Sequence, residues 1–214
     1  MRINGEPINT LGTLVQAKDR VEVDGKEASP VTQHTYILYH KPKGLLCSRQ
    51  DEKGRPLIYD VLDVAANVQS VGRLDMDSEG LLLLTDDGDL AKRLTDPAGR
   101  LARGYRVRVA GHVSMDTMEA LRRGGIEMGK EDVSDPWELI VDAETRGHTW
   151  LAVIIRRGRW REVRRTLEAC GHKVRRLIRT AYGPLKLDAD LPPGAWRQLK
   201  AGEIRSLKSA VKSR

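Results

Sequence analysis

Three carboxylates, Asp75, Asp77 and Glu79, lie two residues apart in a stretch that begins with Arg73. Residues 81–84 are all leucine, an apolar run typical of a packed interior. A buried strand at this place would hold the acidic loop rigidly, as catalytic carboxylates usually are held. An ordinary acidic turn before a core strand has the same pattern. The spacing alone therefore leaves a catalytic and a structural interpretation open.

Three kinds of chemistry fit a loop of this composition. Its acids match several positions of a calcium-binding loop that would close at Asp86, but the usual closing ligand is a bidentate Glu. Paired carboxylates could instead hold two divalent ions beside a phosphodiester, as in metal-dependent nucleases, and EDTA sensitivity would test that. The third possibility is one Asp that attacks a nucleoside. An arginine would keep this Asp ionised, and an aromatic ring would hold the base.

Positive charge is concentrated in residues 156–179. Ten basic residues against Glu162 and Glu168 give this segment +8, so the rest of the chain carries −1 of the total +7. A local positive field of this size predicts a polyanionic partner, most simply a nucleic acid backbone. The alternative is a solvated basic surface without a partner. The basic residues are Arg156, Arg157, Arg159, Arg161, Arg164, Arg165, Lys173, Arg175, Arg176 and Arg179.

Composition excludes several classes of protein. A chain of 214 residues can bury a core without disulfides, and Cys47 and Cys170 lie far apart, which predicts a reducing, cytoplasmic setting. The longest aliphatic run is too short to span a membrane. The five histidines lack zinc-site spacing, and no glycine-rich phosphate loop follows a strand. The four tryptophans are expected to be packing anchors, with Trp160 a candidate RNA contact among arginines.

Hydrophobic periodicity predicts an α+β fold with a mixed, mostly antiparallel sheet. We expect strands at 36–39, 104–109, 137–141, 149–155 and 173–182, and helices ending at 94 and spanning 115–123, 160–170 and 201–211. In the helix at 160–170, Arg161, Arg164 and Arg165 are expected to form a stripe opposite the apolar face. Residues 1–30 read as short strands and turns too polar for a core of their own, with a boundary near Ser29-Pro30.

Four motifs occur together in a fixed order: residues 72–75, 78–85, 104–107 and 158–165. Together they resemble the RsuA/RluB branch of ribosomal RNA pseudouridine synthases, and the similarity runs from about residue 36 to 199. Residues 39–44 with 54–56, and 176–179 before Tyr182-Gly183, look most like RluB-type members, which act on the large subunit. The resemblance implies the pseudouridine synthase fold.

The resemblance also implies an isomerase that detaches uracil from ribose, rotates it and reattaches it through carbon, with neither metal nor cofactor. Asp75 would be the catalytic carboxylate, attacking the ribose or the base. Tyr105 would stack on the flipped uracil, and Arg164 would pair with Asp75. Arg73 would help displace the uridine, and Leu177 would line the pocket. The residues themselves indicate one ionised Asp, one arginine and one aromatic. They do not choose Asp75 over Asp77, or Arg164 over its neighbour.

The basic segment would contact RNA. The residues expected to do so are Arg157, Arg159, Arg161, Arg165, Arg175, Arg176 and Arg179.

Residues 1–30 are similar to the C-terminal half of the S-four-type RNA-binding module that precedes the catalytic domain, here 31–214, in this branch. The basic helical pair that forms the first half of that module is not found in residues 1–30, and the catalytic chemistry is expected to survive without it. The expected partner is large-subunit rRNA, as a precursor or an assembly intermediate, and the expected state is a monomer. The alternative function is a catalytically inactive RNA-binding ribosome-assembly factor of the same fold.

Overall fold

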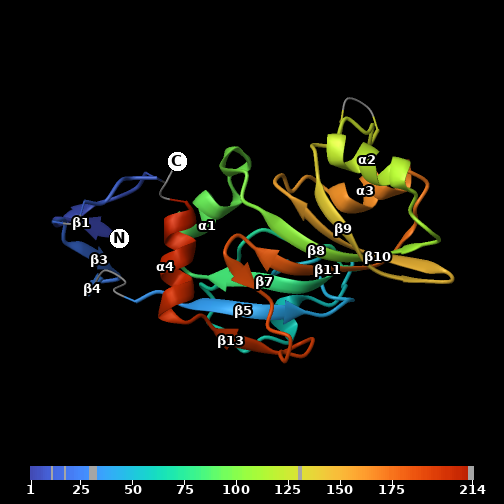
Figure 1. Ribbon diagram of the computed structural model, residues 1–214. Helices are drawn as coiled ribbons and strands as arrows, with labels where there is room; N and C mark the ends of the chain where they lie inside the picture. Colours follow the sequence, from blue (N-terminus) through green and yellow to red (C-terminus); the bar gives the residue numbers. More distant parts are fainter. Residues whose placement is uncertain (11, 17, 29–32, 130–131, 212–214) are drawn as a thin grey trace. The chain divides into compact units, whose positions relative to one another are not determined.

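The computed structural model describes residues 1–10, 12–16, 18–28, 33–129 and 132–211. The chain divides into two compact units, Met1–His34 and Thr35–Arg214 (Figure 1). The boundary predicted near Ser29-Pro30 lies outside the described residues.

The first unit has one antiparallel sheet with the strand order β2-β1-β3-β4. Its strands are β1 (Arg2–Ile3), β2 (Glu6–Pro7), β3 (Val21–Val23) and β4 (Lys26–Ala28). Positive φ angles at Asn4 and Gly5, and again at Asp24 and Gly25, allow the tight hairpin turns that the sequence predicted. Most described side chains of this unit are exposed, which agrees with the expected lack of an independent core.

The second unit is built on a nine-stranded sheet in the order β13-β5-β7-β11-β8-β10-β9, with β6 on β7 and β12 on β11. The strands are β5 (Tyr36–Lys41), β6 (Gln69–Ser70), β7 (Glu79–Thr85), β8 (Arg103–Ala110), β9 (Glu138–Thr145), β10 (His148–Ile155), β11 (Val174–Tyr182), β12 (Leu185–Lys186) and β13 (Trp196–Gln198). Among the described strand pairs of this sheet, β11 and β7 are parallel and the others are antiparallel. The predicted α+β class with a mixed, mostly antiparallel sheet is confirmed.

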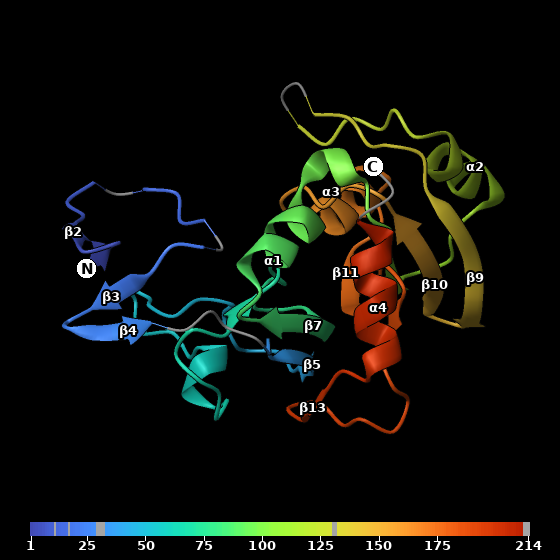
Figure 2. The ribbon, with the colours of Figure 1, turned by 90° about the vertical axis from the view of Figure 1, so that its left-hand side faces the viewer.

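The helices of the second unit are α1 (Gly88–Thr95), α2 (Met115–Arg123), α3 (Glu162–Ala169) and α4 (Ala201–Ala210). Single 3₁₀ turns occur at Ile58–Asp60 and Pro97–Gly99. Side-chain caps begin two of the helices, because Asp87 accepts from the Leu90 amide and Ser114 from the Thr117 amide. Figures 1 and 2 show α1 and α4 near β5 and β7, and α2 and α3 beside the strands around β10.

Strand β7 explains the leucine run, because its alternate side chains enter two different cores. Leu81 and Leu83 pack in the cluster that includes residues of α1 and α4. Leu82 and Leu84 pack in the cluster that includes residues of α2 and α3. All four side chains are fully buried. A strand covered on both faces has no polar alternation, and it holds the acidic loop before it rigidly.

Two predicted elements differ from the structure. The hairpin of β9 and β10 turns at residues 146–147, so most of the loop predicted at 142–148 is strand. The acidic residues of β9 are exposed, as charged side chains often are on a strand at the edge of a sheet. Helix α3 starts at Glu162, because Arg161 adopts the left-handed conformation with φ 48° and is the N-cap.

Candidate active site

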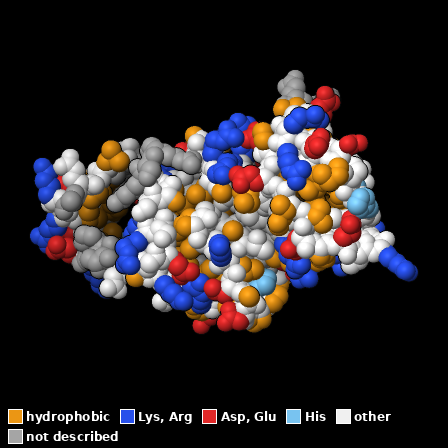
Figure 3. Space-filling view, in the orientation of Figure 1, with side chains coloured by type: hydrophobic (Ala, Val, Ile, Leu, Met, Phe, Trp, Pro, Cys, Tyr) orange, Lys and Arg blue, Asp and Glu red, His pale blue; other side chains and the backbone are white. Residues whose placement is uncertain are grey.

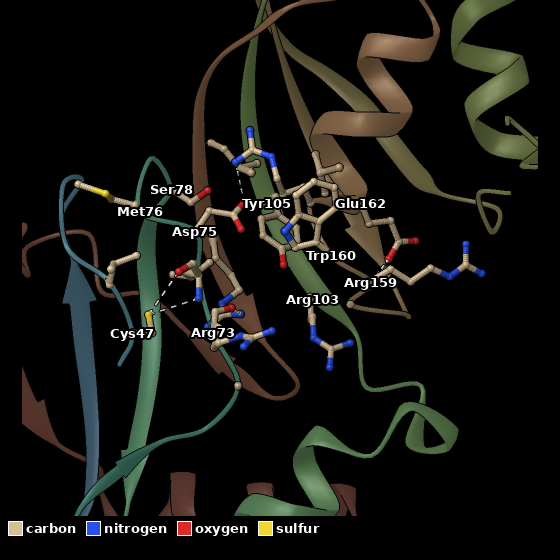
Figure 4. A pocket seen from close by; sticks show the side chains of 18 of the residues that line it. Cys47, Arg73, Asp75, Met76, Ser78, Arg103, Tyr105, Arg159, Trp160 and Glu162 are labelled. Carbon is tan, nitrogen blue, oxygen red and sulfur yellow. Dashed lines mark hydrogen bonds and ion pairs between the residues drawn. The ribbon is translucent and has the colours of Figure 1, made fainter. Parts of the chain in front are cut away.

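The acidic loop opens onto a cavity of about 730 Å³ in the second unit (Figure 4). Its lining comes mainly from five separate segments: residues 46–55, the loop at 72–78, strand β8, the stretch at 155–163 and strand β11. Among the predicted site residues, Arg73, Asp75, Tyr105, Arg159, Arg161, Leu177 and Arg179 line this cavity. In Figure 4, Asp75, Ser78 and Met76 lie on one side, and Trp160, Glu162 and Arg159 lie on the other.

Lys41 holds the backbone of the acidic loop through hydrogen bonds. Its side chain is fully buried at the end of β5, and Nζ donates to the carbonyl oxygens of Asp75 (3.2 Å), Ser78 (3.0 Å) and Pro42 (2.9 Å). Burial lowers the pKa of Lys41, and nearby groups, among them the carboxylate of Asp75, oppose this shift. The Ser78 amide also donates to the Asp75 carbonyl, 3.0 Å away. Lys41 thus fixes the backbone from which the Asp75 carboxylate projects.

Gly80, near the start of β7, allows β7 and β11 to approach closely. It has φ +109°, and a Cβ at this position would lie 2.3 Å from the Arg179 carbonyl oxygen. Any larger residue would therefore push β7 and β11 apart where Asp75 and Leu177 face one cavity.

The Asp75 carboxylate faces a different arginine from the one predicted. The Asp75 side chain is 27% exposed, and its Oδ2 lies 3.7 Å from Arg161 Nη1. Arg164 instead donates to the Asp77 carbonyl oxygen at 2.9 Å and lies 3.1 Å from the Asp77 carboxylate. Arg164 therefore forms its direct ion pair with Asp77 and not, as predicted, with Asp75, although the charge of Asp75 opposes the lowering of the Arg164 pKa by burial. The left-handed conformation of Arg161 directs its side chain to both acids, and Arg164, one turn later, is buried beneath the loop.

Tyr105 and Leu177 are brought to the cavity by the sheet. Tyr105 on β8 is 8% exposed and Leu177 on β11 is 4% exposed. The two strands pair antiparallel, with Leu177 opposite Val107, so both side chains enter the same core cluster. Arg73 is exposed at the mouth of the cavity. The predicted aromatic, the carboxylate and the apolar wall thus come together from segments distant in the sequence.

Most of the basic segment is neutralised by acids from elsewhere in the chain. Asp132 lies within 2.9 Å of both Arg159 and Arg165, and Asp135 lies 3.0 Å from Arg157. The stripe of Arg161, Arg164 and Arg165 predicted opposite the apolar face of α3 does not form, because Arg161 precedes the helix, Arg164 is buried and Arg165 binds Asp132. A charge count along the sequence missed these partners, since they come from residues 75–79 and 132–138.

Two further arginines predicted to bind RNA have structural contacts. Arg176 makes a bidentate pair with the buried Glu79 carboxylate, at 3.0 and 2.8 Å. Arg179 is 3% exposed and donates to the Leu81 carbonyl oxygen at 2.8 Å. Arg175 is exposed, and no ion pair is formed by it within the described part of the chain. It is therefore the member of this group best placed for a phosphate.

Glu162 and Cys47 are cavity residues that the sequence did not single out. Glu162 is 2% exposed, and its Oε2 accepts from the Arg159 amide at 3.0 Å. Its Oε1 has no hydrogen-bond partner among the described residues, and burial raises the pKa of this carboxyl. Burial likewise raises the pKa of the Cys47 thiol, which donates to the Leu74 carbonyl. A glutamate at the start of a helix gives no sequence signal that it will be buried.

The acids do not converge as either metal interpretation required. Glu79 lies within β7 and pairs with Arg176, and Asp86 accepts from the Thr35 amide, so they do not form one calcium loop. Over residues 1–10, 12–16, 18–28, 33–129 and 132–211, no three His, Cys, Asp or Glu side chains form a group that could hold a metal ion. In the same residues, no helix has the length and apolar character needed to cross a membrane.

Comparison with known proteins identifies the family of this chain. Residues 35–169 match the family described as RNA pseudouridylate synthase. The chain is 36% identical over 222 residues to ribosomal large subunit pseudouridine synthase B of Xylella fastidiosa, covering 99% of this chain and 46% of the relative. It therefore spans about half the length of that relative. It is 38% identical over 214 residues to an uncharacterized RNA pseudouridine synthase of Aquifex aeolicus, covering 99% of this chain and 84% of that protein.

A solved crystal structure of a pseudouridylate synthase superposes with a TM-score of 0.76 and 30% identity, over 96% of this chain and 87% of that one. The fold, the matched segment and the full-length similarity agree. The chain therefore belongs to the RNA pseudouridylate synthase family.

Proposed function

We propose that this protein isomerises a uridine of large-subunit ribosomal RNA to pseudouridine, with Asp75 as the catalytic carboxylate. One observation carries the proposal: Asp75, Tyr105 and Leu177 line a single cavity although they come from three distant segments. The names of the relatives from Xylella fastidiosa and other bacteria support large-subunit rRNA as the substrate. The proposed substrate is a precursor or assembly intermediate, bound by a monomer in the cytoplasm.

The reaction breaks the bond between N1 of uracil and C1′ of ribose and forms a bond between C5 and C1′. N1 gains a proton and C5 loses one, so the product has the same atoms as the substrate. Asp75 acts as the nucleophile, attacking either the ribose or the base. Arg161 orients its carboxylate from 3.7 Å, and Arg164 positions the loop through Asp77.

The target uridine must leave its stack to reach Asp75, at a cost of a few kcal/mol. Tyr105 and Leu177 offer the apolar wall on which a flipped uracil would rest. Arg73, exposed at the mouth, is placed to fill the space that the uridine leaves. We also propose that the unit Met1–His34 is part of an S-four-type RNA-binding module and adds RNA contacts.

Tritium release from 5-tritiated uridine in unmodified large-subunit rRNA tests the catalytic assignment. Asp75→Asn should abolish release while RNA binding and folding persist. Asp77→Asn is the matched control, because the Asp77 side chain is half exposed, and it should retain measurable release. Substantial release by Asp75→Asn would refute the assignment. Tyr105→Phe should retain stacking and Tyr105→Ala should lose it, so wild-type activity of Tyr105→Ala would refute the stacking role.

An inactive ribosome-assembly factor of the same fold is separated from this proposal by mapping pseudouridines in rRNA. Cells that lack the protein should lose one or more specific pseudouridines of the large subunit, and wild-type protein should restore them. An unchanged map together with a ribosome-assembly defect would favour the inactive factor.

A further inference from the structure

We propose that Trp160 forms a stacking site for the base of the nucleotide next to the target uridine, a proposal that rests on the function given above. The Trp160 side chain lines the same cavity as Asp75, and Figure 4 places it on the opposite side, with Arg159 and Glu162. A uracil held between Asp75 and Tyr105 would bring the neighbouring base to the cavity that Trp160 also lines.

Trp160 is the more exposed of the two tryptophans that lie at the surface of the described residues. Trp160 is 69% exposed, whereas Trp137 is 3% exposed and sits in the core. Trp196 is also exposed, at 40%, but it lies on β13, which is at the other end of the sheet from β9. Single exposed apolar residues are ordinary on protein surfaces. One that faces into the substrate cavity offers a flat surface for a base.

Hydrogen bonds within the protein hold the backbone at Arg159 and Trp160. The Arg159 amide donates to the buried Glu162 carboxylate at 3.0 Å, and Arg165 Nη1 donates to the Trp160 carbonyl oxygen at 3.3 Å. The side chains on either side are tied by ion pairs, Arg159 to Asp132 and Arg161 to Asp77. A tryptophan has only two side-chain torsions, so stacking on this turn costs little conformational entropy.

Two arginines of the cavity supply positive charge that suits a nucleotide, because Arg103 and Arg73 line it together with Trp160. The Arg165 guanidinium, whose carbon lies 5.7 Å from the centre of the Trp160 ring, is paired with Asp132 and helps to hold the ring in place. Stacking is available to every base because each has a π face. This site would therefore add affinity for single-stranded RNA with little sequence preference, and the specificity for uridine would remain at Asp75 and Tyr105.

The test compares binding of two probes, single-stranded octauridylate and uridine 5′-monophosphate. End-labelled octauridylate is titrated with the whole protein by fluorescence anisotropy, and the mononucleotide is measured as its competitor. Trp160→Ala should weaken octauridylate binding about ten-fold and leave mononucleotide binding unchanged. Trp160→Phe should recover most of the affinity because it keeps an aromatic face. Trp196→Ala, which removes the other exposed tryptophan, should bind both probes like wild type.

The stacking proposal is overturned if Trp160→Ala binds octauridylate as tightly as wild type, if it loses both probes equally, or if wild type binds no octauridylate. In tritium-release kinetics on rRNA, Trp160→Ala should raise KM and preserve kcat, and a fall in kcat alone would count against the proposal. Absence of tritium release by the wild-type protein would refute the proposed function instead. The binding comparison would still decide the stacking site.

Discussion

Replacing Lys41 by methionine should both destabilise the second unit and lower activity. Methionine preserves the apolar stem of this fully buried side chain and removes the ammonium that holds three carbonyl oxygens, among them those of Asp75 and Ser78. The carboxylate of Asp75 would keep its chemistry but lose the anchor of its backbone. The variant therefore separates loop position from the reacting group.

The magnitude follows from the three hydrogen bonds. Bonds to a charged group contribute about 1.5 kcal/mol or more each, so their loss costs about 4 to 5 kcal/mol. Removing a buried ammonium also relieves its desolvation penalty, which offsets part of this loss. The Asp75 carbonyl keeps the Ser78 amide as a donor. We expect the free energy of unfolding to fall by about 2 to 3 kcal/mol and kcat to fall about a hundred-fold, because small displacements of a catalytic group have effects of that order.

Urea unfolding monitored by tryptophan fluorescence measures the stability change, because all four tryptophans lie in the second unit. Tritium release at saturating rRNA measures kcat. Lys43→Met is the control: its side chain is 46% exposed and lies 3.4 Å from Glu79, a pair expected to contribute less than about 1 kcal/mol. If Lys41→Met were as stable and as active as Lys43→Met, the anchoring role of Lys41 would be wrong.

Three other predictions concern single charges. Glu162→Gln should be more stable than wild type at neutral pH, because burial raises the pKa of this carboxyl. Between the unfolded and folded pKa values, the folded state holds a proton that the unfolded state has released, so the stability of the wild type falls with rising pH by up to about 1.4 kcal/mol per pH unit. Unfolding curves that show no such difference between wild type and Glu162→Gln would contradict this. Arg161→Ala should lower kcat by about ten- to a hundred-fold by freeing the Asp75 carboxylate, and unchanged single-turnover rates would refute that role. Arg175→Glu should weaken RNA binding and reduce the slope of log affinity against log salt concentration by about one or more. Arg176→Glu should instead mainly destabilise the fold, because the new carboxylate repels the buried Glu79. A salt slope unchanged in Arg175→Glu would show that Arg175 does not contact phosphate.

Local patterns in the sequence were enough to predict most elements of the second unit. Helix α2 spans residues 115–123 as predicted, between the N-cap Ser114 and the C-cap Gly124. The leucine run is a strand buried on both faces, as an apolar stretch without alternation indicates. Helix α3 was predicted two residues too early, because left-handed backbone at Arg161 leaves no mark in hydrophobic periodicity.

The sequence by itself determined that a carboxylate loop precedes a buried strand, and only the resemblance of its motifs to a known family singled out Asp75 and Tyr105. Tertiary structure alone decided which arginine faces Asp75, because that depends on the backbone conformation at Arg161. It also decided how much of the basic segment is available to RNA, since Asp132 and Glu79 reach the arginines from distant parts of the chain. Ion pairs and buried hydrogen bonds depend on how close two residues lie in space, and a count of charges along the sequence carries no information about that distance.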